Sequence, residues 1–126
     1  LNMPAIWSLK VALEICSEKF EENLRIEDEL IEYLLDKLNR LEHVIVYDQK
    51  FKRVSTVGFN LMNRKSNEVV EFLDRCGICT RGGIHCAILA HEALGTKEFG
   101  VVRISMGAFN RKEEIDTMIK HLEDCR

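Results

Sequence analysis

The sequence has one proline, few aromatic residues and no long apolar run. Because Pro4 is that proline, no proline-rich linker divides the chain, and we find no repeat or low-complexity tract. Every apolar run is shorter than the ~18 residues that a membrane-spanning helix needs, and the N-terminus lacks the layout of a signal peptide. We therefore expect a cytoplasmic protein that does not enter a membrane.

A broad positive charge is also lacking. The formal net charge is -3, so the chain offers no cationic field to nucleic acid or to an anionic membrane. Its 126 residues, 46% hydrophobic and 31% charged, suffice for one globular domain with a core and are too few for two. We therefore treat residues 1–126 as a single domain.

The number of cysteines is odd, and without a secretory signal this argues against a disulfide framework. The thiols then serve as core filler, metal ligands or nucleophiles. Three of the five fall within eleven residues, so that stretch is where chemistry is expected. The cysteines are Cys16, Cys76, Cys79, Cys86 and Cys125.

The pattern of apolar residues predicts an α+β fold. Helices are expected over residues 4–16, 24–41, 66–76, 87–94 and from Asn110 onward, where Asn110 caps and Glu113 reaches back. Strands are expected over 43–47, 55–62, 78–80 and 101–106. This order favours a small mixed or antiparallel sheet of three to four strands with helices packed on one face.

The first helix is apolar around almost its whole circumference, which one small domain cannot cover. Its apolar residues imply a second surface, either another domain or another subunit. They are Ile6, Trp7, Leu9, Val11, Ala12, Leu13, Ile15 and Cys16.

Three interpretations of the cysteine-rich stretch compete. A zinc site would use Cys76, Cys79, Cys86 and either His85 or His91, but a second spaced cysteine pair is absent. A redox dithiol at Cys76 and Cys79 would lie beside the wrong end of a helix, so small-hydrophobe packing is the better interpretation of both.

The third interpretation is a single nucleophilic thiol, Cys86. Gly82 and Gly83 free the preceding backbone, Arg81 adds positive charge, and a helix is expected to begin just after the cysteine; these features favour the thiolate. An isolated cysteine is otherwise core filler.

Alternation along the last strand puts Arg103 and Ser105 on one face and Val102, Ile104 and Met106 on the other. Arg103 is then either an ordinary solvent-facing residue or a guanidinium that faces a cleft, where it would bind a carboxylate through two hydrogen bonds.

Taken together, these segments resemble the cysteine desulfurase branch of the class-V aminotransferases. Residues 81–87 (RGGIHCA) are similar to the family's active-site cysteine loop, and 89–96 (LAHEALGT) follow at the family's spacing. Residues 102–105 (VRIS), with 109–110 and 113–116, are similar to its closing signature, and residues 2–4 to the crossover between its large and small domains.

The resemblance implies the small C-terminal domain of a fold-type-I pyridoxal-phosphate enzyme, with residues 1–20 as the interdomain helix. Cys86 would take sulfur from L-cysteine as a persulfide while alanine leaves; the closely similar release of selenium from selenocysteine is the alternative reaction. Arg103 would hold the substrate carboxylate, and Arg81 would lie at the mouth of the same pocket. No role for His85 follows.

The resemblance also implies partners that this chain does not supply. The cofactor lysine of the family follows a Ser-x-His context that no lysine here has, so pyridoxal phosphate would be bound by an N-terminal domain and not by this chain. The isolated chain is expected to be inactive, and the intact protein to be a homodimer that passes sulfur to an acceptor protein. Two alternatives remain: a separately encoded sulfur-accepting or regulatory module, and a small zinc-binding domain.

Overall fold

The computed structural model describes residues 1–47, 54–84 and 87–125. Its elements follow the order α1 (Met3–Glu18), α2 (Phe20–Asn39), β1 (Val44–Val46), β2 (Thr56–Leu61), α3 (Ser66–Arg75), α4 (Ile88–Leu94), β3 (Val102–Ser105) and α5 (Lys112–Asp124). Among the described residues, no helix combines the length and apolar character needed to cross a bilayer.

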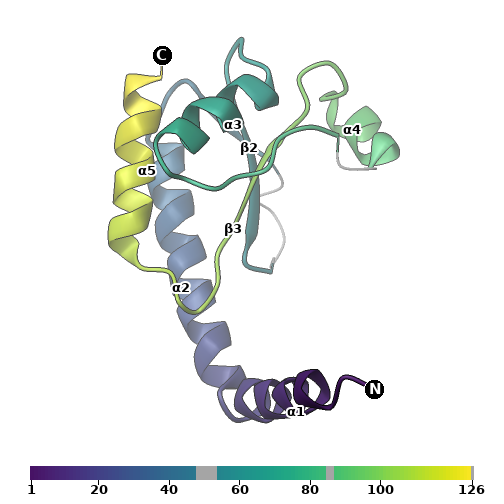
Figure 1. The fold of residues 1–126 in the computed structure, drawn as a ribbon. Helices are drawn as coiled ribbons and strands as arrows, with labels where there is room; N and C mark the ends of the chain where they lie inside the picture. The colour runs from purple at the N-terminus through teal and green to yellow at the C-terminus, as the bar shows by residue number, and fades with distance from the viewer. Residues whose placement is uncertain (48–53, 85–86, 126) are drawn as a thin grey trace.

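The three strands form an antiparallel sheet with β2 in the centre, in the order β1-β2-β3 (Figure 1). Val46 of β1 pairs with Phe59, and Thr56 and Phe59 of β2 pair with Ser105 and Val102 of β3. The expected α+β fold is thus confirmed, with three strands among the described residues.

The core lies between the sheet and α2, α3 and α5, which cover one of its faces (Figure 1). Each helix contributes the apolar stripe that its spacing predicts, and β2 and β3 contribute alternate residues. The most deeply buried apolar side chains are Leu34, Leu38, Val57, Phe59, Val69, Leu73, Val102, Ile115, Met118 and Leu122.

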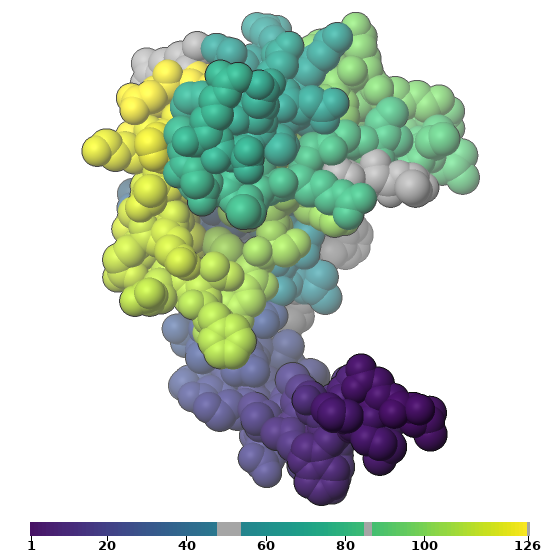
Figure 2. All heavy atoms as spheres, in the orientation of Figure 1, coloured from purple at the N-terminus to yellow at the C-terminus, as the bar shows by residue number. Residues whose placement is uncertain are grey.

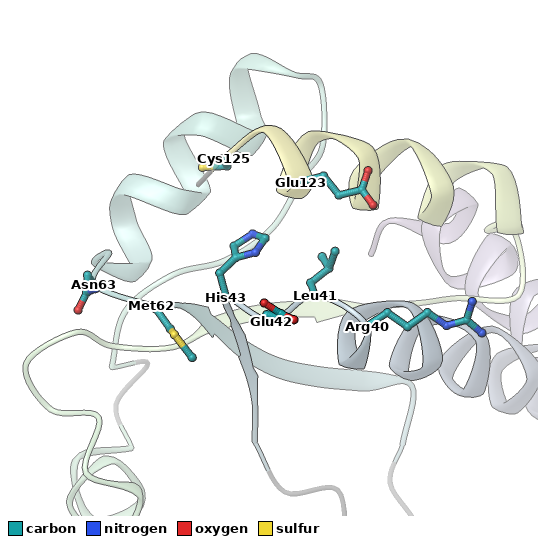
Figure 3. Close-up of a pocket in the computed structure, with 8 residues that line it drawn as sticks. All are labelled: Arg40, Leu41, Glu42, His43, Met62, Asn63, Glu123 and Cys125. Atoms are coloured by element: carbon teal, nitrogen blue, oxygen red, sulfur yellow. The ribbon is translucent and has the colours of Figure 1, made fainter.

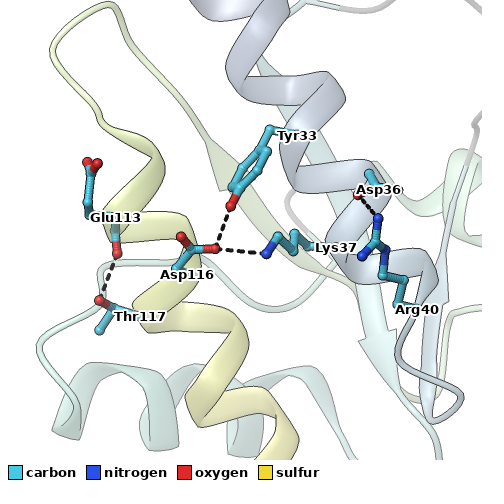
Figure 4. A network of polar contacts seen from close by, with 7 residues as sticks. All are labelled: Tyr33, Asp36, Lys37, Arg40, Glu113, Asp116 and Thr117. Carbon is cyan, nitrogen blue, oxygen red and sulfur yellow. Dashed lines mark hydrogen bonds and ion pairs between the residues drawn. The ribbon is translucent and has the colours of Figure 1, made fainter.

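A polar contact joins α2 to α5 at the surface of this helical layer (Figure 4). The Tyr33 hydroxyl donates a hydrogen bond of 2.7 Å to the Asp116 carboxylate, and Lys37 Nζ lies 3.2 Å from the same oxygen. The hydrogen bond from Tyr33 and then the Lys37 ammonium hold the pKa of Asp116 below its usual range. The contact joins residues of two helices that are 83 positions apart in the chain.

Helix α1 stands apart from this body and is joined to it through α2 (Figures 1 and 2). It has no buried residue, and its large apolar side chains are about half exposed, for example 66% for Trp7 and 60% for Leu9. The expectation that the small domain alone cannot cover this helix is confirmed. The N-terminal end of α2 shares the exposure, since Leu24 is 41% exposed.

Two local predictions need correction. Residues 78–80 do not form a strand; the pairing at this edge is one isolated bridge between Arg81 and Arg103. Helix α5 begins at Lys112, where the Glu114 carboxylate accepts the backbone N–H of Arg111. Asn110 does not cap it, because its side-chain oxygen accepts the N–H of Gly107 at 2.8 Å.

The predicted end of the third helix is confirmed. Gly77 has a φ of +76°, the Ile78 N–H donates to the Leu73 carbonyl at 2.9 Å, and the Gly77 N–H donates to the Asp74 carbonyl at 2.8 Å. These two bonds are those of a Schellman motif, which turns the chain sharply out of α3 toward Arg81.

Candidate functional site

Strand β3 presents Arg103 and Ser105 on the sheet face that the helices leave open. Val102 and Ile104 are buried on the other face, so the predicted alternation is confirmed. The hydroxyls of Ser105 and Thr56 lie 3.0 Å apart across β2 and β3. The open face therefore carries hydrogen-bonding groups and a guanidinium side by side.

The residue opposite Arg103 on β2 is Gly58, so no side chain stands beside the arginine on that strand. A Cβ added to Gly58 would lie 3.0 Å from Val101 Cγ1, a tight contact. Gly58 was not among the predicted site residues, although a glycine inside a strand is a signal of close approach.

Arg81 lies next to Arg103, on the other edge of β3. The two residues exchange both backbone hydrogen bonds, at 3.0 Å from Arg81 N and 2.7 Å from Arg103 N. In such a pair the Cα atoms are about 5.5 Å apart and the side chains project from the same face. The structure thus places two arginines together that are 22 positions apart in the chain.

Both guanidinium groups are exposed, and no ion pair engages either of them within the part of the chain that the structure describes. Like charges on adjacent strands repel. A carboxylate would relieve that repulsion, and an arginine can bind it through two parallel N–H···O bonds. The pair is therefore suited to an anionic ligand.

The predicted nucleophile, Cys86, and the neighbouring His85 lie outside the described residues. On the N-terminal side the description reaches Gly83 and Ile84, with a φ of +117° at Gly83. On the C-terminal side Ala87 N–H donates to the Ile84 carbonyl at 3.0 Å, and α4 follows at once. The prediction that a helix begins just after Cys86 is confirmed.

The other thiols have ordinary surroundings. Cys16 and Cys79 are exposed and Cys76 is half-buried, so the expected packing of Cys79 as a small hydrophobe is wrong. The reason is that residues 78–80 are not a strand packed into the sheet. Cys125 is buried at the end of α5, and this burial raises the pKa of its thiol.

The described residues give the zinc interpretation no support. His91 is buried, and its Nδ1 lies 2.7 Å from the hydroxyl of Thr96, which follows just after the end of α4. Across residues 1–47, 54–84 and 87–125, no three histidine, cysteine or acidic side chains gather as metal ligands.

A cavity of about 670 Å³ opens between the C-terminal ends of α2 and α5 and the neighbouring ends of β1 and β2 (Figure 3). His43, the residue before β1, points into it, with Nε2 2.9 Å from the Leu122 carbonyl. Neither Arg81 nor Arg103 lines this cavity, so it is separate from the basic pair. Its lining consists of Arg40, Leu41, Glu42, His43, Met62, Asn63, Glu123 and Cys125.

Comparison with known proteins places the chain in a family. The family model described as aminotransferase class-V matches residues 1–118. The chain belongs to the class-V aminotransferases. Among curated proteins, a probable cysteine desulfurase of Halalkalibacterium halodurans is 38% identical over 100 residues, which are 79% of this chain and 24% of that protein.

Solved structures of other members share the fold. The apo cysteine desulfurase of Thermococcus onnurineus NA1 is 30% identical, with a TM-score of 0.76 over 82% of this chain and 26% of that one. A NifS-like protein from Rickettsia africae is 24% identical, with a TM-score of 0.85 over 98% of this chain and 34% of that one. The chain spans about a quarter to a third of the length of these class-V aminotransferases.

Pyridoxal phosphate is the cofactor of members of this family, and one structure of the lyase C-DES has glycine linked covalently to it. A lysine that holds this cofactor must lose its proton, which burial or a nearby cation promotes. Six described lysines are exposed. The seventh, Lys37, has its pKa raised by the hydrogen bond with Tyr33 and then by Asp116. Lys50 and Lys52 lie outside the described residues. The described lysines therefore do not fit as holders of the cofactor.

Proposed function

We propose that this chain is the small C-terminal domain of a pyridoxal-phosphate-dependent cysteine desulfurase. The observation that carries the proposal is the Arg81–Arg103 pair on the open face of the sheet, in a chain of this family whose relatives are named cysteine desulfurases. Residues 1–20 form the interdomain helix, and the apolar surface of α1 packs against the N-terminal, cofactor-binding part of the protein.

In this proposal, Arg103 binds the α-carboxylate of L-cysteine, and Arg81 stands at the entrance of the same site. The thiolate of Cys86 attacks the substrate sulfur, so a sulfur–sulfur bond forms while the carbon–sulfur bond of the substrate breaks. The electron pair of the broken bond remains on the substrate carbon, which takes a proton and leaves as alanine. Pyridoxal phosphate, held by the rest of the protein, supplies the electron sink for this chemistry.

The first test uses the whole protein that contains this chain. With cysteine as substrate, mass spectrometry should find one extra sulfur on Cys86, together with one alanine released per persulfide formed. Cys86→Ala should abolish both, while Cys79→Ala, at the exposed thiol seven positions earlier, should change neither. Persulfide on Cys79 with Cys86 unmodified would refute the assignment.

The second test addresses Arg103. An ammonium cannot reproduce a two-bond carboxylate contact. Arg103→Lys should therefore lower kcat/KM for cysteine roughly 10- to 150-fold, which corresponds to a loss of about 1.5–3 kcal/mol in transition-state binding. The matched control is Arg75→Lys, on α3, where the side chain is 75% exposed and ion-paired with Glu71. Equal kinetics in the two variants would return Arg103 to the role of an ordinary surface residue.

A further inference from the structure

The segment that carries Cys86 leaves the body of the domain and returns to it at one point. The Val101 N–H donates to the Gly83 carbonyl at 3.1 Å, which joins the residues before and after segment 84–100. Two residues further out, Arg81 and Arg103 exchange their own pair of backbone bonds. We refer to Asn60, Ser66, Gly83 and residues 100–102 as the loop junction.

The side chain of Asn60 is the centre of this junction. It is 4% exposed, and its Nδ2 donates to the Gly100 carbonyl at 2.7 Å while its Oδ1 accepts the Val102 N–H at 3.2 Å. The two bonds fall on either side of Val101, whose N–H goes to Gly83. One amide therefore bonds two backbone groups at the point where the chain enters β3. A buried backbone group left without such a partner is costly.

The loop junction is closely packed. The Ser66 N–H, at the start of α3, donates to the Phe99 carbonyl at 2.8 Å, and Ser66 is 2% exposed. A Cβ placed on Gly100 would lie 2.4 Å from Ser66 Oγ and 3.0 Å from Gly83 Cα. Gly100, where the segment rejoins the domain, therefore packs against Gly83, where the segment begins, and against Ser66 in the first turn of α3.

We propose that Asn60 is a positioning residue for the desulfurase reaction: its amide sets where the Cys86 segment starts and ends relative to Arg103. This rests on the proposed function. Asn60 acts through the Gly100 carbonyl and the Val102 N–H. Because misplacing a reacting group by about 1 Å costs up to about 100-fold in rate, loss of the amide should slow sulfur transfer more than it weakens substrate binding.

The experiment compares Asn60→Ala with Phe59→Leu in the whole protein. Phe59 is the preceding residue of β2 and is fully buried on the core face, so its truncation lowers stability while the Asn60 amide and its two bonding partners stay in place. Tyr47→Phe is a second control, since it removes only the weak 3.4 Å contact to Asn60. Two quantities are measured: the single-turnover rate of persulfide formation on Cys86, and the hydrogen exchange of peptides that cover residues 80–84 and 96–103.

For Asn60→Ala we expect the persulfide rate at saturating cysteine to fall about 10- to 100-fold, with faster exchange in both peptides. The persulfide rate of Phe59→Leu should fall far less, although its loss of Tm is comparable. The rate of Tyr47→Phe should equal that of the wild type. Equal losses in Asn60→Ala and Phe59→Leu, or unchanged exchange in Asn60→Ala, would overturn the proposal.

Two further outcomes are decided by the same design. If Asn60→Ala does not fold, Asn60→Asp gives both readouts, because it keeps the acceptor for Val102 and replaces the donor to Gly100 by an oxygen. If the wild-type protein forms no persulfide, the proposed function fails. The hydrogen-exchange comparison then still shows whether Asn60 holds the loop junction together. If Asn60→Ala and Phe59→Leu exchange equally in the two peptides, that role of Asn60 is overturned.

Discussion

Gly100 offers a quantitative test of the packing at the loop junction. Its φ is +66°, in the left-handed region, and an added Cβ would meet Ser66 Oγ at 2.4 Å and Gly83 Cα at 3.0 Å. An alanine in this conformation costs about 1–2 kcal/mol, and overpacking costs about 1–3 kcal/mol more. Gly100→Ala should therefore lower the free energy of unfolding by about 2–5 kcal/mol.

The control separates the two contributions. Gly95 ends α4 with a φ of +68°, and an added Cβ there would meet no atom within 4 Å. Gly95→Ala should thus cost only the backbone part, about 1–2 kcal/mol. The difference between the two variants measures the steric clash alone.

The assay is urea unfolding followed by far-UV circular dichroism. Fluorescence is less suitable, because Trp7 lies on the exposed helix α1. Removing the Ser66 hydroxyl by Ser66→Ala should make the added cost of Gly100→Ala smaller, since the nearest clashing atom is gone. If Gly95→Ala and Gly100→Ala lower the free energy of unfolding by amounts that agree within about 0.5 kcal/mol, the packing argument is refuted. That difference is the scatter expected of independent surface changes.

Two further outcomes follow from the surface of the domain. The chain should self-associate through α1, and Leu9→Glu, at a side chain that is 60% exposed, should shift sedimentation toward the monomer; a wild-type monomer would contradict this. The lowered pKa of Asp116 means that its ionised form stabilises the fold above about pH 4 and that this contribution is lost as pH falls through the lowered pKa. Asp116→Asn should remove this part of the acid dependence, whereas Glu113→Gln, one turn away, should retain it.

The parts of the fold that follow from local pattern were predictable from the sequence. The exposure of Arg103 and Ser105 follows from the two-residue period of a strand, and the end of α3 follows from the conformational freedom of Gly77. The exposure of α1 follows from composition, since a helix that is apolar all round needs more than one packing partner.

The parts that depend on distant residues were not predictable in this way. Whether 78–80 forms a strand depends on what pairs with it, and only Arg81 finds a partner, 22 positions later. The role of Asn60 is equally non-local, because its amide bonds residues 40 and 42 positions away. A polar residue between Phe59 and Leu61 in a buried strand was the available signal.

The meeting of Gly83 with Val101 also bears on how freely this domain can vary. A segment whose two ends are held together by the body of the protein can change in length at little thermodynamic cost, since each doubling of a loop adds only about 0.6 kcal/mol of closure entropy. The sheet and its helical layer use the Gly83 and Phe99 carbonyls at the two ends of the segment. The residues between these two ends can therefore change in length while the scaffold below stays the same.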